Sequence, residues 1–160
     1  MSRAFVKEDG LDNAPLPDLP ISPHPNYVTS SGLAQLQHRL SRKQADLAIL
    51  KSRADRLDRL PEAAAERDIR YLEARLRSAI AVPDPVAPQQ VEFGVTVTVR
   101  DGSGQTARWR IVGEDEADIP LGLIAPHAPL ARALIGARVG DTVEWRKPTG
   151  VVLLDVVGLA

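Results

Sequence analysis

Leucines recur at heptad spacing in the segment that follows Thr29. They fall on one helical stripe, with a positions at Leu33, Leu40, Leu47 and Ala54 and d positions at Leu36, Leu50 and Leu57. Lys43 alone interrupts this stripe, at a d position. Thr29, Ser30 or Ser31 can cap the start of the helix, and Pro61 ends the run. The spacing therefore predicts a long amphipathic helix.

A second helical pattern starts near Pro61, which fits the first turn of a helix. Its apolar residues repeat at intervals of three and four: Ala65, Ile69, Leu72, Leu76 and Ala79. Two amphipathic helices joined by a short break are typical of an antiparallel coiled-coil hairpin. At about 1.5 Å per residue, we expect a first arm of ~40 Å and a second of ~30 Å.

The pattern changes to period two in residues 91–99, where valines and Phe93 alternate with mostly polar residues. Residues 101–104 supply a turn into a second run at 106–112, so these two runs predict a β-hairpin. A short helical pattern follows at 130–135, and two last strands are expected at 141–145 and 151–157. The predicted fold class is α+β, with an N-terminal helical hairpin followed by an antiparallel β-domain that carries one short helix.

Proline-rich stretches divide the chain. Five of the thirteen prolines lie before Asn26 and predict an extended N-terminal tail over 1–26. A second such stretch predicts a linker over 83–90, between a coiled coil at 27–82 and the C-terminal domain at 91–160. At the start of the tail, Phe5 and Val6 stand between Arg3 and Lys7. Residues 2–8 are thus either a docking segment on a stiff spacer or a frayed end.

Charge is distributed unevenly, although the net charge is only −1. Residues 27–82 carry an excess of Lys and Arg, and residues 83–160 carry an excess of acids. A duplex-binding domain would concentrate more positive charge, so we expect a protein partner and no direct sequence-specific binding of nucleic acid. The chain lacks both a long apolar run and an apolar leader, which predicts a cytoplasmic protein without a membrane partner.

Candidate chemistry is sparse, because cysteine is absent and the three histidines lack metal-ligand spacing. No cofactor or resident metal is predicted. The sequence also lacks a Gly-x-Ser-x-Gly motif, a Walker phosphate loop, the glycine pattern of dinucleotide-binding enzymes and a Cys–His pair. Asp55, Asp58 and Glu62 stand near the break between the helices and could together hold Mg2+. The arginines that alternate with them favour ordinary ion pairs instead.

Several motifs resemble the bacterial Gre transcript-cleavage factors, also called the GreA/GreB transcription elongation factor family. These are Thr29-Ser30-Ser31-Gly32-Leu33, Asp68-Ile69-Arg70-Tyr71-Leu72, Ile111-Val112-Gly113-Glu114-Asp115-Glu116-Ala117-Asp118, and the run from Ala128 to Gly136 with Val139-Gly140-Asp141. The last is similar to the family signature Ser-Pro-x-Ala-x-Ala-Leu-x-Gly-x-x-x-Gly-Asp, with Ala128 in place of the usual serine.

This resemblance implies an FK506-binding-protein-like C-terminal domain. It also implies docking of that domain on the rim of the RNA polymerase secondary channel, with the coiled coil projecting into the channel. The residues that match the docking segment are Pro129, Leu130, Ala131 and Leu134.

The sequence departs from the cleavage-active relatives at the tip of the coiled coil. Those relatives carry an acidic loop similar to Asp-x-x-Glu-Asn, which is absent here. The interval from Thr29 to Tyr71 is also roughly fifteen residues shorter, or ~10 Å of lost reach. Ligation of a metal needs contacts of about 2 Å. The short arm is similar to the Rnk-like variant of the family.

We therefore expect a monomeric regulator, not an enzyme, that binds RNA polymerase and modulates elongation or competes with other channel-binding factors without cleaving RNA. One alternative is a GreB-like cleavage factor that rescues backtracked polymerase with Asp55, Asp58 or Glu62. Another is a peptidyl-prolyl isomerase, which is suggested only by the expected fold.

Overall fold

The computed structural model describes residues 14–160, which form two compact units. One unit contains the described residues up to Pro23 together with Leu36–Arg77, and the other contains His24–Gln35 and Ser78–Ala160. The base of the helical hairpin is thus grouped with the C-terminal domain. The predicted docking segment at residues 2–8 lies outside the described residues, and the predicted domain boundaries stay predictions.

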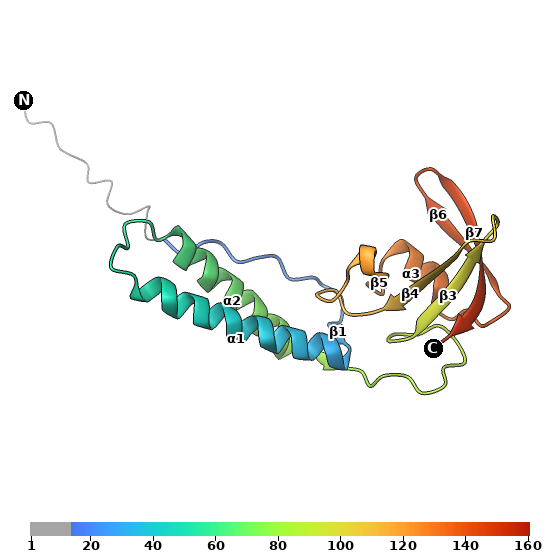
Figure 1. Cartoon of the computed structure of the whole chain (residues 1–160), viewed down its shortest axis with the longest axis horizontal. Coiled ribbons are helices and arrows are strands. Elements are labelled where there is room, and N and C mark those ends of the chain that lie inside the picture. Colours follow the sequence, from blue (N-terminus) through green and yellow to red (C-terminus); the bar gives the residue numbers. More distant parts are fainter. Residues whose placement is uncertain (1–13) are drawn as a thin grey trace, which may run out of the picture. The chain divides into compact units, whose positions relative to one another are not determined.

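Two helices, α1 (Ser30–Ser52) and α2 (Leu60–Ser78), form the predicted hairpin (Figure 1). Beyond the first turn of α1, the positions shielded from solvent are the a and d positions of the predicted stripe: Leu33, Leu36, Leu40, Lys43, Leu47 and Leu50. The stripe ends there, because α1 stops at Ser52. Ala54 and Leu57, predicted to continue it, lie in the connecting loop, and Leu57 is 94% exposed. That part of the heptad assignment is wrong.

Lys43, which interrupts the apolar stripe, forms an ion pair with an acid of the other helix. Its Nζ lies 3.0 Å from Asp68 Oδ2 on α2. Although partial burial raises the pKa of Asp68, hydrogen bonds from Arg67 and Lys43 outweigh this effect and hold that pKa below its usual value. The polar interruption of the stripe is therefore a cross-helix ion pair.

Residues 14–23, here called the strap, run extended beside the hairpin (Figure 1). Their prolines disfavour helix and withhold backbone donors. Arg70 of α2 holds the strap at two points: its Nε donates to Asp18 Oδ1 at 2.6 Å, and its Nη2 donates to the carbonyl oxygen of Leu16 at 2.8 Å. Leu16 and Leu19 are half-buried. The strap is thus the third element of this unit.

The second unit contains a five-stranded sheet with the strand order β5-β4-β3-β7-β6. Its strands are β3 (Thr96–Asp101), β4 (Thr106–Ile111), β5 (Leu123–Ile124), β6 (Thr142–Lys147) and β7 (Gly150–Leu159). Neighbouring strands are antiparallel except β4 and β5, which run parallel. The short helix α3 (Pro129–Leu134) and the 3-10 helix η1 (Ile119–Leu121) complete the unit.

The first predicted strand begins later than expected, because β3 starts at Thr96. Gly94 has a φ of 88°, so the backbone is not extended at this residue and the strand begins only after it. Val91 is nevertheless buried, and its N–H donates to the carbonyl oxygen of Ala137. In residues 91–99, the alternation of apolar and polar residues therefore predicts which side chains are buried better than it predicts which residues pair in the sheet. A two-stranded parallel sheet of β1 (Tyr27–Val28) and β2 (Ile80–Ala81), not predicted from the sequence, closes the base of the hairpin.

The hydrophobic core lies between one face of the large sheet and α3. It contains Val97, Val99, Ile111, Leu130, Ala131, Leu134, Leu154 and Val156, and Trp109 and Trp145 pack against it. The predicted α+β class, a helical hairpin followed by an antiparallel β-domain with one short helix, is confirmed.

The contact between Arg70 and the strap gives a first prediction. Arg70→Ala should free residues 14–23 from α2 and cost about 1 kcal/mol or less, because both partners are partly exposed. Limited proteolysis should then cut the strap sooner. Arg77→Ala, on the last turn of the same helix, is the control and should leave the rate of cleavage unchanged. Equal cleavage rates in the two variants would contradict the anchoring role.

Candidate functional site

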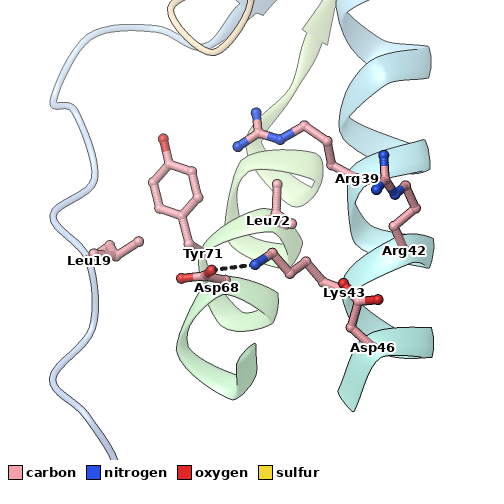
Figure 2. A pocket seen from close by; sticks show the side chains of 8 residues that line it. All are labelled: Leu19, Arg39, Arg42, Lys43, Asp46, Asp68, Tyr71 and Leu72. Atoms are coloured by element: carbon pink, nitrogen blue, oxygen red, sulfur yellow. Dashed lines mark ion pairs between the residues drawn. The ribbon is translucent and has the colours of Figure 1, made fainter. Parts of the chain in front are cut away.

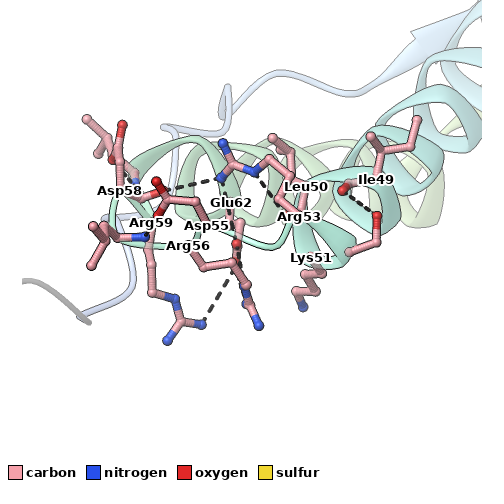
Figure 3. A network of polar contacts seen from close by, with 12 residues as sticks. Ile49, Leu50, Lys51, Arg53, Asp55, Arg56, Asp58, Arg59 and Glu62 are labelled. Carbon is pink, nitrogen blue, oxygen red and sulfur yellow. Dashed lines mark hydrogen bonds and ion pairs between the residues drawn. The ribbon is translucent and has the colours of Figure 1, made fainter.

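The connection between α1 and α2 is organised around Glu62, in the first turn of α2 (Figure 3). Its side chain is 3% exposed, and Arg56 contacts both carboxylate oxygens, with Nε to Oε1 at 2.9 Å and Nη2 to Oε2 at 2.6 Å. Nη2 of Arg53 and Nη2 of Arg59 lie 3.9 and 3.7 Å from the same carboxylate. One carboxylate is thus surrounded by three guanidinium groups, an arrangement called here the arginine clamp.

The clamp shifts the titration of its members. The hydrogen bond from Arg56 is the main reason why the pKa of Glu62 lies below its usual value, with Coulomb attraction to all three arginines adding to it. The same bond raises the pKa of Arg56. Glu62 is therefore ionised at neutral pH, and its charge is already balanced within the protein.

The other two candidate carboxylates support the backbone of the loop. Asp55 Oδ1 accepts a hydrogen bond from the Leu57 N–H at 3.0 Å, and Asp58 Oδ1 accepts one from the Leu60 N–H at 2.9 Å. Each bond closes a turn of the kind that aspartate favours. Within residues 14–160, no group of three or more His, Cys, Asp or Glu side chains is placed to hold a metal ion. The structure brings the three predicted carboxylates to the same end of the hairpin, with Asp55 and Asp58 in the loop and Glu62 in the first turn of α2, and gives each a structural partner.

The outer surface of the loop combines cations with apolar side chains. Arg53, Arg56 and Arg59 keep 37–46% of their side chains exposed while they contact Glu62. Leu57 and Leu60 are also exposed. The tip therefore presents guanidinium edges and leucine side chains outward, and it withholds its most buried carboxylate.

The predicted docking residues lie on α3, where packing dominates. Leu130, Ala131 and Leu134 are at most 4% exposed and belong to the hydrophobic core. Pro129 is the exposed one of the four. These three buried side chains hold α3 on the sheet by packing in the hydrophobic core. A docking role for the segment stays a prediction, and it would fall to Pro129 and to exposed neighbours such as Arg132 and Ile135.

Glu116, which sequence reasoning did not single out, joins the start of α1 to the C-terminal domain within one unit. Its carboxylate accepts hydrogen bonds from Thr29 Oγ1 and, at 2.6 Å, from Ser31 Oγ. Thr29 Oγ1 in turn accepts from the Gly32 N–H at 2.9 Å, as an N-cap does. A carboxylate at this end is also favoured by the helix dipole. The signal in the sequence was the presence of both partners in the quoted motifs.

Gly32 is part of the same joint. A Cβ built at Gly32 would lie 2.5 Å from Glu116 Oε2, which is too close for any side chain. The glycine therefore leaves the space that the carboxylate occupies.

The clamp predicts a pH-dependent tip. Because the folded-state pKa of Glu62 is lowered, the stabilisation by its ionised form is complete above its ordinary pKa of about 4.5 and is lost as the pH falls through the lower folded value. The protection factors of the backbone amides of residues 53–59, which correct for the intrinsic pH dependence of hydrogen exchange, should fall in that acidic range. In Glu62→Gln, the protection factors should be lower at pH 7 and should no longer change with pH in that range. A variant that keeps the parent's profile would show that Glu62 does not order the loop.

The joint predicts a local loss of stability. Glu116→Ala should lower the free energy of unfolding by about 2 kcal/mol, since it leaves the Thr29 and Ser31 hydroxyls without their charged acceptor. Chemical denaturation followed by circular dichroism measures this change. Glu92→Ala, an exposed acid of the same unit, should cost far less. Equal losses in the two variants would count against the joint.

Known proteins are similar to this chain over much of its length. The family model "Transcription elongation factor, GreA/GreB, C-term" matches residues 86–159. A GreA from Verminephrobacter eiseniae is 38% identical over 140 residues, which cover 85% of this chain and 82% of that protein. A GreB from Pseudomonas aeruginosa is 42% identical over 90 residues, covering 56% of this chain and 54% of the relative.

Solved structures are also similar to this chain. The GreA factor homolog Gfh1 of Thermus thermophilus has 23% identity and a TM-score of 0.42, with 86% of this chain and 99% of that one covered. A GreA/GreB factor from Nitrosomonas europaea has 25% identity and the same TM-score, with coverage of 84% and 98%. The extent and identity of the sequence matches show that the chain belongs to the GreA/GreB family of transcription elongation factors.

Proposed function

We propose that this protein binds RNA polymerase at the secondary channel and modulates elongation, or competes with other channel-binding factors, without promoting RNA cleavage. Membership of the GreA/GreB family supports polymerase as the partner. The family resemblance implies that the C-terminal domain docks on the channel rim and that the hairpin enters the channel.

The arginine clamp carries the non-cleaving part of the proposal. A cleavage factor must offer carboxylate oxygens to a metal, which favours negatively charged oxygen ligands. Glu62 instead shares its charge among three arginines, and Asp55 and Asp58 accept backbone hydrogen bonds. Releasing Glu62 would leave three guanidinium groups without their shared counter-ion. The short arm, about 10 Å less in reach than in cleavage-active relatives, favours the same conclusion.

Cleavage by a GreB-like mechanism is the second candidate, because relatives named GreA and GreB match most or half of the chain. It would require Asp55 or Asp58, the more exposed acids of the tip, to turn toward the metal. The isomerase alternative has no comparable support, since Trp109 and Trp145 pack against the hydrophobic core.

The deciding experiment uses stalled, backtracked polymerase with and without this protein. The protein alone should leave the transcript intact, and an excess should suppress cleavage stimulated by a conventional Gre factor. Asp55→Asn combined with Asp58→Asn should keep this suppression. Robust cleavage by the parent protein that the double variant loses would overturn the regulator proposal in favour of the second candidate.

Docking is tested at exposed positions of α3 and its flank, so that folding is preserved. Arg132→Glu combined with Ile135→Asp should weaken binding to core polymerase about tenfold or more, as expected for central interface residues. Val151→Ser, at an exposed position on β7, is the matched control. Unchanged binding in the folded double variant would show that this segment does not dock.

A further inference from the structure

A groove lies between the strap and the two helices of the hairpin (Figure 2). Its volume is about 510 Å³, within the range of small-molecule sites. Its walls come from all three elements: Leu19 of the strap, Arg39, Arg42, Lys43 and Asp46 of α1, and Asp68, Tyr71 and Leu72 of α2. All of these residues belong to one compact unit. The strap thus turns an open helix surface into a groove.

Two of the cations in the groove are uncommitted. Lys43 is paired with Asp68, but among the described residues Arg39 and Arg42 have no ion-pair or hydrogen-bond partner. They lie three residues apart on α1, so they share a side of the helix. Elsewhere in the hairpin, the clamp arginines and Arg70 are engaged with the protein itself. The two guanidinium groups of the groove are therefore available as ligand donors.

The uncharged part of the groove is apolar and partly aromatic. Leu72 is buried, and Leu19 and Tyr71 are half-buried. Figure 2 shows the Arg39 side chain extending from α1 toward α2, on the same end of the groove as the Tyr71 ring. Guanidinium groups match phosphate oxygens in pairs, and a tyrosine ring with leucine neighbours can stack against a flat base.

We propose that this groove binds a nucleotide, with its phosphates at Arg39 and Arg42 and its base against Tyr71. The site is separate from the tip and from α3, so the proposal goes beyond polymerase binding and is tested on the free protein. Asp46 lies four residues and ~6 Å along α1 from Arg42, so its charge limits affinity by repelling the phosphates.

The test titrates the full-length protein with four probes at constant ionic strength: ATP, inorganic triphosphate, adenosine and an acidic peptide. Binding is followed by calorimetry and by NMR of the arginine side chains. ATP should bind saturably with a Kd at or below about 1 mM, triphosphate more weakly, and adenosine without saturation. Adenosine binding as tightly as ATP would overturn the proposal, as would an acidic peptide that saturates the site while ATP does not.

Variants assign the binding to the groove. Arg39→Ala combined with Arg42→Ala should weaken ATP about tenfold or more. Arg108→Ala combined with Arg138→Ala removes the same charge from exposed positions of the other unit and should change the Kd by less than about twofold. If the two double variants bind ATP equally well, ATP does not use this groove and the proposal fails.

Two further substitutions separate the roles within the site. Tyr71→Leu should weaken the binding of ATP and leave the binding of triphosphate unchanged, because the substitution removes only the contact with the base. Asp46→Asn should tighten both by about twofold, since it removes a nearby like charge. Thermal melts confirm that each variant is folded. A folded Tyr71→Leu protein that binds ATP like the parent would remove the base contact and reduce the site to phosphate alone, which contradicts a nucleotide site.

Discussion

A carboxylate that is taken out of water must find donors within the protein, and this constraint shapes both ends of the helical hairpin. Glu62 and Glu116, at 2% and 9% exposure, are its buried acids within the described residues. The first gathers three arginines and so determines the form of the tip. The second gathers two hydroxyls at the start of α1 and so determines how that helix begins. Withdrawing either carboxylate would leave these donors without their shared acceptor.

Much of the architecture could be predicted, because burial imposes a period on the sequence. The shielded side of α1 coincides with the predicted leucine stripe up to Leu50. Each run of alternating apolar and polar residues lies in or beside a strand of the sheet. The prediction failed where single hydrogen bonds decide the outcome. Ala54 and Leu57 continue the heptad arithmetic, but side chains of Ser52 and Arg53 bond to the carbonyl oxygens of Ile49 and Leu50 at the end of α1. Periodicity carries no information about such local bonds.

The candidate site was predictable in its residue types more than in its geometry. The alternation of Asp55, Asp58 and Glu62 with arginines correctly favoured ion pairs, but only coordinates distinguish a buried shared carboxylate from solvated pairs. For α3, the family motif pointed to residues whose side chains belong to the hydrophobic core. A sequence motif does not distinguish residues that pack in the core from residues that contact a partner. The strap was expected to be extended, but its contact with Arg70 could not be predicted. Asp18 and Arg70 are 52 residues apart, so their hydrogen bond leaves no local pattern in the sequence.

That long separation affects the order in which the chain can be built. The strap is synthesised before any of α2, and its contacts with Arg70 become available only when the second helix has been made. Until then, its closely spaced prolines keep it from forming a competing helix. Closing a loop of this length also costs entropy that two polar contacts alone do not offset. Seating of the strap is therefore a late step in folding, one that follows formation of the hairpin and completes its groove.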